Sequence, residues 1–269
     1  MLFRNIKKKK RPYKLGLALS GGGARGYAHL GALKALNEYG IFPDIIAGTS
    51  VGSLIGVLYA DGYTPDEMLS IAKTLKLRTL VESTIPRDGI FKATGIASIL
   101  RRHLRAKTFE ELKYPVYVVA SDIESGEIKV FNTGKIIPAV MASCSVPIIF
   151  TPIEINGRHY VDGGLLKNFP VSTIRDVCDR VIGIDISPVI SVEYDRSMKY
   201  IVERAMNYMV GANTVEERNA CDYLVELNEV SDYSLFDFKH IEEIYEKGYE
   251  ATIKYLKTPR KKIKRGLKI

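Results

Sequence analysis

Short apolar runs alternate with longer segments of helical periodicity along most of this chain. Residues 14–19 are strand-like, and in residues 26–37 apolar side chains recur every three or four positions. The same order repeats with a strand at 44–48 and a helix from Ser50 to about Gly62. Strands that alternate with helices in this way predict βαβ units and a parallel sheet.

The rest of the chain continues this pattern. The nearly all-apolar run at residues 115–120 is typical of a strand buried in the middle of a parallel sheet. Because no repeat or linker interrupts the pattern, we expect one α/β domain over residues 14–256. The other expected elements are helices at 64–76, 94–104, 137–143, 193–217 and 241–256, strands at 181–184 and 223–227, a hairpin partner at 127–132, and a hairpin of 153–155 with 159–161.

Two segments have patterns that suggest a specific role. Residues 77–93 hold proline, glycine and no clear periodicity, so we expect a cap or lid there. The helix at 193–217 has apolar residues at helical spacing, which favours packing against a core. We therefore expect one face of that helix to be buried. Its members are Met198, Ile201, Ala205 and Met209.

Positive charge is concentrated at the two ends of the chain. The 269 residues carry a net charge of +8, with 46% hydrophobic and 26% charged residues. Residues 1–14 and 257–269 hold seven Lys or Arg each and no acid, which leaves 25 basic against 31 acidic residues elsewhere. An acidic body does not favour nucleic acid as a partner. Basic tails at 1–13 and 257–269 favour an anionic membrane surface, or they are solvated and disordered.

The cysteines and the apolar runs indicate a cytoplasmic protein. Cys144, Cys178 and Cys221 are widely spaced, which suggests buried thiols in a reducing compartment rather than a disulfide framework or a zinc site. The run at 15–19 is too short for a signal peptide. The run at 136–150 is broken by prolines and is shorter than the roughly 20 residues of a membrane span. Any membrane contact is expected to be peripheral.

The candidate nucleophile is Ser50, which lies in the pattern G-x-S-x-G between Gly48 and Gly52. The pattern follows a predicted strand and precedes a predicted helix. A serine on such a sharp turn has an exposed hydroxyl, and the two glycines allow the turn. The pattern alone is weak evidence, because glycine and serine are common in turns.

A glycine-rich loop follows the first strand. Gly21, Gly22 and Gly23 would present successive N–H groups at a helix N-terminus, which suits a developing oxyanion. Arg25 adds a positive charge, or it could pair with a carboxylate and fix the loop. The loop also matches the dinucleotide fingerprint G-x-G-x-x-G. That interpretation expects an acid at the end of the second strand, whereas Asp44 begins it.

The candidate base is Asp162, at the end of a predicted strand and followed by two glycines. In the order Ser, acid, His that is typical of α/β-hydrolases, only His240 follows Asp162, and no turn signal surrounds it. The simplest arrangement is a pair of Ser50 and Asp162. Alternatively Asp162 is a turn residue, and Asp122 or Asp185 stands at the end of another strand. The remaining histidines, which fit a triad no better, are His29, His103 and His159.

Three motifs in this order resemble the patatin-like phospholipase family, over about residues 14–190. The resemblance implies a three-layer α/β/α fold with a mainly parallel sheet. It further implies a serine-aspartate dyad that cleaves acyl esters of phospholipids or lysophospholipids through an acyl-enzyme, with no metal or cofactor. The motifs are Gly21-Gly22-Gly23-Ala24-Arg25-Gly26, Gly48-Thr49-Ser50-Val51-Gly52 and Asp162-Gly163-Gly164.

The resemblance assigns a role to each motif. Ser50 would be the nucleophile and Asp162 the base, and the amides of Gly21 to Gly23 with Arg25 would form the oxyanion site. Two other functions stay open at this point. One is a nucleotide-binding oxidoreductase that uses the glycine-rich loop, and the other is a non-catalytic membrane or regulatory protein on the same fold.

Overall fold

The computed structural model describes residues 10–74, 82–83, 91–92, 94–188, 191, 193–235 and 237–258. Most of both basic tails and most of the segment expected to form a lid, residues 77–93, lie outside these described residues. Two short strands of that segment are described, and they pair with each other in an antiparallel manner. They are β3 (Glu82–Ser83) and β4 (Phe91–Lys92).

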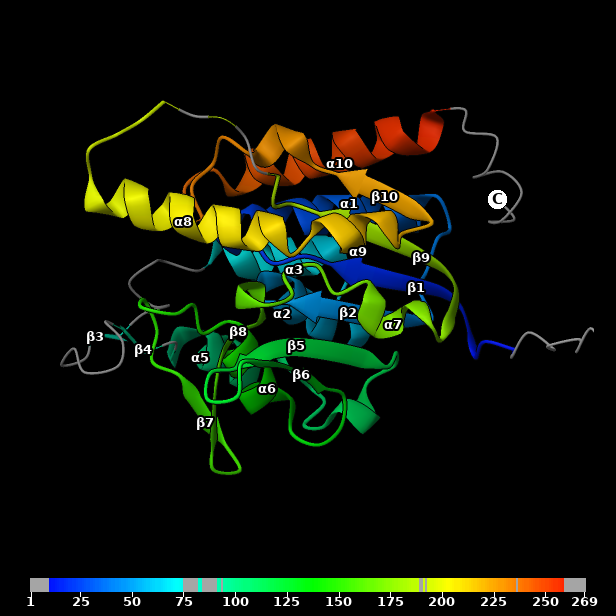
Figure 1. The fold of residues 1–269 in the computed structure, drawn as a ribbon. Coiled ribbons are helices and arrows are strands. Elements are labelled where there is room, and N and C mark those ends of the chain that lie inside the picture. Colours follow the sequence, from blue (N-terminus) through cyan, green and yellow to red (C-terminus); the bar gives the residue numbers. More distant parts are fainter. Residues whose placement is uncertain are drawn as a thin grey trace, which may run out of the picture.

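A mainly parallel sheet forms the centre of the molecule (Figure 1). Its described strands follow the order β10-β9-β1-β2-β5-β8-β7. The first five strands in this order are parallel to one another, and β8 and β7 are antiparallel to their neighbours. Strand β6 also pairs with β5, in an antiparallel manner. The α/β prediction is therefore confirmed. The strands are β1 (Tyr13–Leu19), β2 (Ile45–Thr49), β5 (Val116–Asp122), β6 (Glu127–Phe131), β7 (Ile153–Ile155), β8 (Arg158–Asp162), β9 (Cys178–Asp185) and β10 (Tyr223–Glu226).

Helices cover both faces of this sheet. The α-helices are α1 (Tyr27–Glu38), α2 (Val51–Ala60), α3 (Pro65–Lys73), α5 (Thr94–His103), α6 (Ile136–Ser143), α7 (Ser172–Arg175), α8 (Met198–Ala212), α9 (Val215–Asn219) and α10 (Ile241–Lys257). Short 3₁₀ helices are η1 (Gly23–Gly26), η2 (Phe109–Glu111), η3 (Gly163–Leu165) and η4 (Asn228–Val230). Figure 1 shows α7, α8 and α9 on one side of the strands and α1 and α10 on the other.

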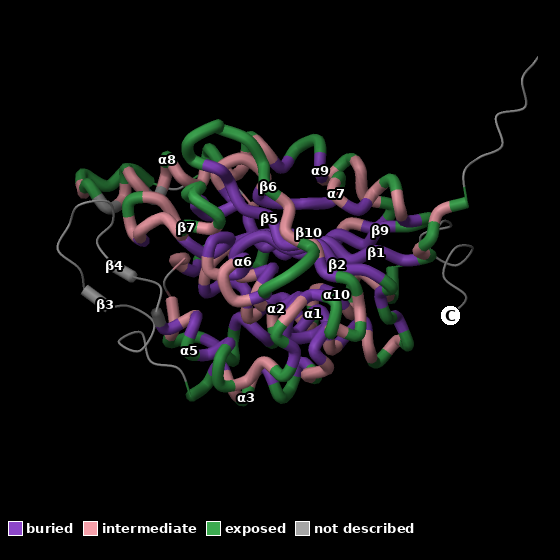
Figure 2. The backbone as a smooth tube through the Cα atoms, turned by 90° about the horizontal axis from the view of Figure 1, so that it is seen from below, coloured by how far each residue is buried: buried purple, intermediate pink, exposed green. Residues whose placement is uncertain are grey.

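The alternation of side chains along the strands produces two separate cores. Leu17 and Leu19 of β1 join a large buried cluster with side chains of α1, α2 and α10. Ala18, between them, joins a smaller cluster with Phe169 and Ile174 on the α7 side. Successive residues of a strand point to opposite faces, so both faces are covered, as parallel sheets require. Figure 2 shows the buried residues running along the central strands.

The final helix is part of this body because it packs closely against α1. A Cβ on Gly31 would lie 2.0 Å from the Tyr245 carbonyl oxygen, and one on Gly248 would lie 2.2 Å from that of Ala28. Only glycine leaves room for backbones at this separation. Helix α10 therefore supports α1, the helix that follows the glycine-rich loop.

The long helix expected at residues 193–217 is broken in the structure. It consists of α8 and α9, with Asn213 and Thr214 between them. The Asn213 amide nitrogen donates to the Gly164 carbonyl oxygen at 3.0 Å, and the Asn168 N–H donates to the Asn213 side-chain oxygen at 2.8 Å. The break therefore attaches this helix pair to the loop that follows β8.

The prediction that the apolar stripe of α8 packs against the core is wrong. Met198, Ile201 and Met209 are 75%, 48% and 40% exposed, and Ala205 is exposed as well. Helical spacing predicts that such residues share one face, but it does not say which way that face points. Here the face is directed away from the sheet.

Candidate active site

Ser50 occupies the tight turn between β2 and α2. Its backbone has φ 53° and ψ −126°, in a region that residues other than glycine rarely adopt. A Cβ on Gly48 would lie 2.5 Å from the Gly52 carbonyl oxygen, and one on Gly52 would lie 2.4 Å from that of Leu19. The two glycines of the G-x-S-x-G pattern are therefore needed because the turn folds back on itself and against β1.

Asp162 lies beside this turn because of how three strands pair with β5. Thr49, the last residue of β2, pairs with Val119, and Asp162, the last residue of β8, pairs with Ala120. Strand β6 pairs with β5 across both of these positions, so it occupies the opposite edge. Strands β2 and β8 therefore share one edge of β5 and meet end to end. This arrangement brings Asp162 close to Ser50, the residue that follows Thr49.

The carboxyl group of Asp162 is buried, and its surroundings shift its acidity. Burial raises the pKa of Asp162 from 3.8 to about 6, while hydrogen bonds from the Ser50 side chain and the Gly164 N–H lower it in part. The Gly164 N–H donates to Asp162 Oδ1 at 2.7 Å. The carboxyl group is thus fixed against Ser50, and at neutral pH it is ionised and can accept a proton.

Two serines that the sequence analysis did not single out hold this pair in place. The Ser50 N–H donates to Ser143 Oγ at 2.8 Å, and Ser143 Oγ donates to the Val119 carbonyl oxygen at 2.6 Å. Ser121 Oγ donates to the Asp162 carbonyl oxygen at 3.1 Å. The only sequence signal for either residue is its position next to a predicted strand or helix end.

The glycine-rich loop lies over the same site, and its glycine amides differ in their hydrogen-bond partners. The Gly21 N–H donates to the Asn168 carbonyl oxygen at 3.0 Å, so it is not available to an oxyanion. Within the described part of the chain, the amides of Gly22 and Gly23 have no acceptor. Gly22 and Gly23 also line the cavity that contains Ser50. The predicted oxyanion site is therefore narrowed to these two amides.

Arg25 is directed away from the predicted oxyanion position. Its Nε donates to the Tyr233 carbonyl oxygen at 2.8 Å and its Nη2 to that of Ser231 at 3.1 Å. The side chain is buried, and Arg25 is not among the described residues that line the cavity. This geometry corrects the direct role in the oxyanion site to a role in fixing the loop, and main-chain carbonyls are among the groups that hold the guanidinium.

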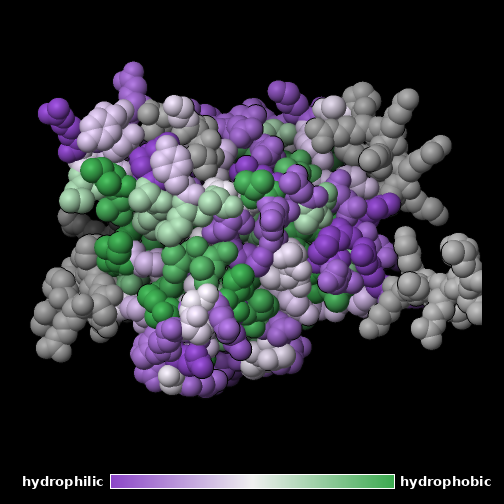
Figure 3. Space-filling model, in the orientation of Figure 1, coloured by the Kyte–Doolittle hydropathy of each residue, from purple (hydrophilic) through white to green (hydrophobic). Residues whose placement is uncertain are grey.

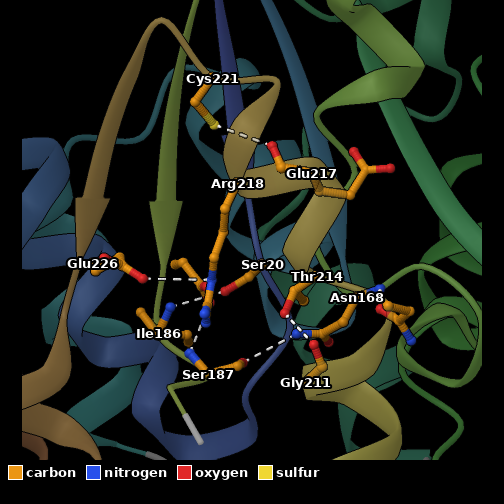
Figure 4. A network of polar contacts seen from close by, with 12 residues as sticks. Ser20, Asn168, Ile186, Ser187, Gly211, Thr214, Glu217, Arg218, Cys221 and Glu226 are labelled. Carbon is orange, nitrogen blue, oxygen red and sulfur yellow. Dashed lines mark hydrogen bonds and ion pairs between the residues drawn. The ribbon is translucent and has the colours of Figure 1, made fainter.

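A polar network anchors the other end of the glycine-rich loop (Figure 4). Ser187 Oγ donates a short hydrogen bond to the Gly21 carbonyl oxygen, and the Asn168 side-chain nitrogen donates to Ser187 Oγ at 3.1 Å. Asn168 also lies against the loop, since a Cβ on Gly21 would meet its side-chain oxygen at 2.4 Å. These contacts join the loop to the ends of β9 and η3. Sequence analysis did not single out Asn168 or this role.

The two alternative acids have other partners. Asp185 accepts from Arg218 Nε at 2.7 Å and from the Ser187 N–H at 2.9 Å, so it supports the same network. Asp122 accepts from Arg158 at 3.0 Å and from two turn amides. Asp44 was considered as the acid of a dinucleotide site. Its carboxylate accepts from the Lys14 and Leu15 N–H groups at the start of β1. These three carboxylates lie outside the group that faces Ser50.

None of the four histidines is among the residues that line the cavity. His240 is exposed and pairs with Asp237 at 2.8 Å, and His159 pairs with Glu124 at 2.8 Å. His29 is buried, and burial lowers its pKa to about 4. Its Nε2 lies 2.9 Å from the Ser20 carbonyl oxygen. Asp162 therefore lies beside Ser50 in this cavity, and no histidine accompanies them.

The site opens into a cavity of about 90 Å³. Ser50 and Asp162 lie at its polar end together with the glycine-rich loop. Most of the other lining side chains are apolar, as in a site that accepts an apolar ligand. They include Val146, Leu165, Met206, Met209, Val210 and Leu235.

Two kinds of feature are absent from the residues that the structure describes. No helix among them combines the length and the apolar character that a bilayer crossing requires. No group of three or more His, Cys, Asp or Glu side chains among them is arranged to hold a metal ion.

Comparisons with known proteins place this arrangement among relatives. A family model described as patatin-like phospholipase matches residues 17–174. An uncharacterized NTE family protein of Mycobacterium tuberculosis is 36% identical over 178 residues, which cover 65% of this chain and 49% of that protein. Patatin-like phospholipase domain-containing protein 7 of Rattus norvegicus is 33% identical over 181 residues, which cover 64% of this chain and 13% of that protein. The matches thus span half or less of these relatives.

Among solved structures, VipD from Legionella pneumophila shares the fold. The comparison has a TM-score of 0.54 and 17% sequence identity, and it covers 92% of this chain and 67% of that chain. The coverage extends beyond the residues that the family model matches, so the similarity of fold includes much of the final third of the chain.

Proposed function

The chain belongs to the patatin-like phospholipase family, and from that premise we propose that it hydrolyses acyl esters of phospholipids or lysophospholipids with Ser50 and Asp162. The observation that carries the proposal is the end-to-end meeting of β2 and β8 on one edge of β5, which sets the hydroxyl of Ser50 against a buried carboxylate. The apolar cavity supports an acyl chain as the part of the substrate that lies next to them.

In the first half of the proposed reaction, Ser50 Oγ attacks the ester carbonyl carbon while Asp162 accepts the hydroxyl proton. The carbonyl oxygen becomes negatively charged, and the amides of Gly22 and Gly23 are placed to donate to it. The C–O bond to the alcohol then breaks, and Asp162 gives its proton to the leaving alkoxide. An acyl-enzyme on Ser50 remains.

In the second half, a water molecule attacks the acyl-enzyme. Asp162 accepts a proton from this water and returns it to Ser50 Oγ as the ester bond breaks, so the free fatty acid leaves and the enzyme is restored. A pKa of about 6 suits both steps, because the carboxylate is ionised at neutral pH and is more basic than an exposed aspartate. The proposed cycle uses side chains and backbone amides of this chain alone.

The test is fluorophosphonate labelling with peptide mapping, combined with acyl release from p-nitrophenyl butyrate and lysophosphatidylcholine. We expect one adduct, on Ser50, and a loss of at least about a thousandfold in turnover for Ser50→Ala and Asp162→Ala. His240→Ala serves as the control, because His240 is exposed and bound to Asp237, and its activity should be unchanged.

Four outcomes would overturn parts of the proposal. An adduct on another serine would show that the nucleophile is misassigned. A His240→Ala variant as inactive as Ser50→Ala would replace the dyad with a triad. A folded wild-type chain with neither labelling nor turnover would favour a non-catalytic membrane or regulatory protein, and saturable NAD(P)H binding would favour the oxidoreductase.

A further inference from the structure

Apolar residues make up most of the exposed positions that the structure describes on α8. The structure describes the exposure of most α8 residues, and every exposed one among them is uncharged. A surface helix normally directs its apolar residues toward the core, whereas α8 exposes several of its apolar residues. We call this surface the α8 apolar face. Its residues are Met198, Ile201, Ala205, Tyr208, Met209 and Ala212.

The α8 apolar face continues into the mouth of the cavity. Met209 is 40% exposed and also lines the cavity with Met206 and Val210. One side chain therefore belongs both to the outer surface and to the chamber that contains Ser50. Figure 3 shows hydrophobic side chains gathered in a band that extends over α8 and the adjoining segment next to β8.

A second segment that lines the cavity also carries an exposed apolar residue. Val146 and Pro147 line the cavity, and the next residue, Ile148, is 64% exposed with φ 72°. A β-branched residue is strongly disfavoured in this left-handed region, so the fold holds an isoleucine outward at a conformational cost. Two exposed apolar features, Ile148 and the α8 apolar face, are thus next to residues that line the cavity.

A polar pair borders the α8 apolar face on one side. Arg204 Nη2 donates to the Tyr208 hydroxyl at 2.7 Å, and the guanidinium carbon lies 4.6 Å from the centre of the Tyr208 ring. Side chains with an apolar body and a polar tip are typical of the level at which lipid headgroups meet the hydrocarbon. This chemistry fits a bilayer surface better than a uniformly apolar protein groove.

We propose that the α8 apolar face and Ile148 dock on the surface of a phospholipid bilayer and open the cavity toward its acyl chains. The inference rests on the proposed function, which requires an acyl ester to leave the bilayer and reach Ser50. Docking at the mouth places that ester next to the cavity without passage through water. Large exposed apolar patches on soluble proteins mark sites that contact another protein or a membrane.

The experiment measures co-sedimentation with neutral phosphatidylcholine vesicles at 0.15 M salt, where attraction by the basic tails contributes little. All variants are made in the Ser50→Ala chain, so that hydrolysis cannot alter the vesicles. Met198→Gln/Ile201→Gln should weaken vesicle binding at least about tenfold. Phe42→Gln is the control, because Phe42 is 52% exposed but precedes β2, at the far end of that strand from Ser50.

A parallel measurement uses the same substitutions in the chain with Ser50 intact. Met198 and Ile201 do not line the cavity, so hydrolysis of monomeric p-nitrophenyl butyrate should be unchanged while hydrolysis of vesicle lipid falls with binding. Ile148→Asn, which suits the left-handed backbone, should reduce vesicle binding in the same way. Retained hydrolysis of the monomeric ester also shows that each variant is folded.

The outcomes separate docking from catalysis. Vesicle binding that is absent in the starting chain, or equal in the double variant and the Phe42→Gln control, overturns the docking proposal. A dimer that the double variant converts to a monomer, with vesicle binding unchanged, would assign the face to a second copy of the chain. If no ester is hydrolysed but binding still depends on Met198 and Ile201, the proposed function fails and the docking surface stands.

Discussion

Thr49 and Asp162 occupy consecutive pairing positions along one edge of β5, opposite Val119 and Ala120. This relationship explains how Ser50 and Asp162 come to lie together where the parallel strand β2 and the antiparallel strand β8 meet. Ser50 follows the last residue of β2, and Asp162 is the last residue of β8, which approaches from the opposite direction. The carboxyl group is therefore placed by sheet pairing rather than by a flexible loop, which favours a fixed geometry between the two side chains.

Asp162→Asn should have opposite effects on activity and on stability. The variant loses the base, so turnover should fall at least about a thousandfold. The raised pKa means that the folded state holds the proton more tightly than the unfolded state, so stability decreases as pH rises from about 4 through about 6. Asparagine removes this penalty. The free energy of unfolding at pH 8 should increase, by at most about 3 kcal/mol, and the gain should disappear near pH 3.

The matched control for this effect is Asp185→Asn. Asp185 is also buried at a strand end, but it pairs with Arg218, so its loss should leave that arginine with only the longer contact to Glu226 and destabilise the fold. Urea denaturation of both variants at pH 3 and pH 8 measures the difference. Equal destabilisation by the two substitutions at pH 8 would contradict the assignment of a desolvated, functional carboxylate to Asp162.

The pH dependence of kcat/KM should report the same group. Only ionised Asp162 can accept the proton of Ser50, so activity should rise with pH and reach a plateau above a midpoint near pH 6. A profile of p-nitrophenyl butyrate hydrolysis between pH 4 and 8 measures this. A midpoint near 4 would indicate a carboxylate exposed to water, which does not fit the buried position of Asp162.

The layers of the fold could be predicted from sequence. The break between α8 and α9 and the direction of the α8 apolar face could not. Apolar runs and helical spacing identify buried strands and helices because burial on both faces of a sheet requires them. The break after Ala212 depends on hydrogen bonds between Asn213 and residues near 164–168, which are distant in sequence. The outward direction of the α8 apolar face likewise depends on what the rest of the chain leaves uncovered.

Within the site, the motif glycines and Ser50 were predictable because a local turn explains them. Gly48 and Gly52 are required by contacts with neighbouring backbone, which the G-x-S-x-G pattern encodes. The assignments that change are those of Gly21 and Arg25, whose partners come from Asn168 and from residues 231–233. A motif shows which residues are close in sequence, but it does not show which amide or guanidinium already has a partner.

Gly23→Ala should impair the proposed oxyanion site. Gly23 has φ +56°, and a Cβ there would lie 2.3 Å from the Leu235 carbonyl oxygen, so the loop has to shift. Because the Gly23 amide would move with it, we expect kcat for p-nitrophenyl butyrate to fall about 10²-fold or more with a smaller change in KM. Gly134→Ala is the control, since Gly134 has φ +75° and open space around it. It should lose about 1 kcal/mol of stability and no activity.

The last prediction concerns the basic tails, most of which lie outside the described residues. A chain trimmed to residues 13–256 lacks thirteen of the 39 Lys and Arg residues and none of the acids. Each Lys or Arg near an anionic surface contributes about 1 kcal/mol, so binding to phosphatidylglycerol vesicles at 0.01 M salt should fall by at least about a hundredfold. The difference from the full chain should shrink at 0.15 M salt, because the Debye length falls to about 8 Å. Binding to neutral vesicles should not change, since it depends on the α8 apolar face. Co-sedimentation of both chains at the two salt concentrations measures this, and equal binding to anionic vesicles at low salt would rule out a role for the tails.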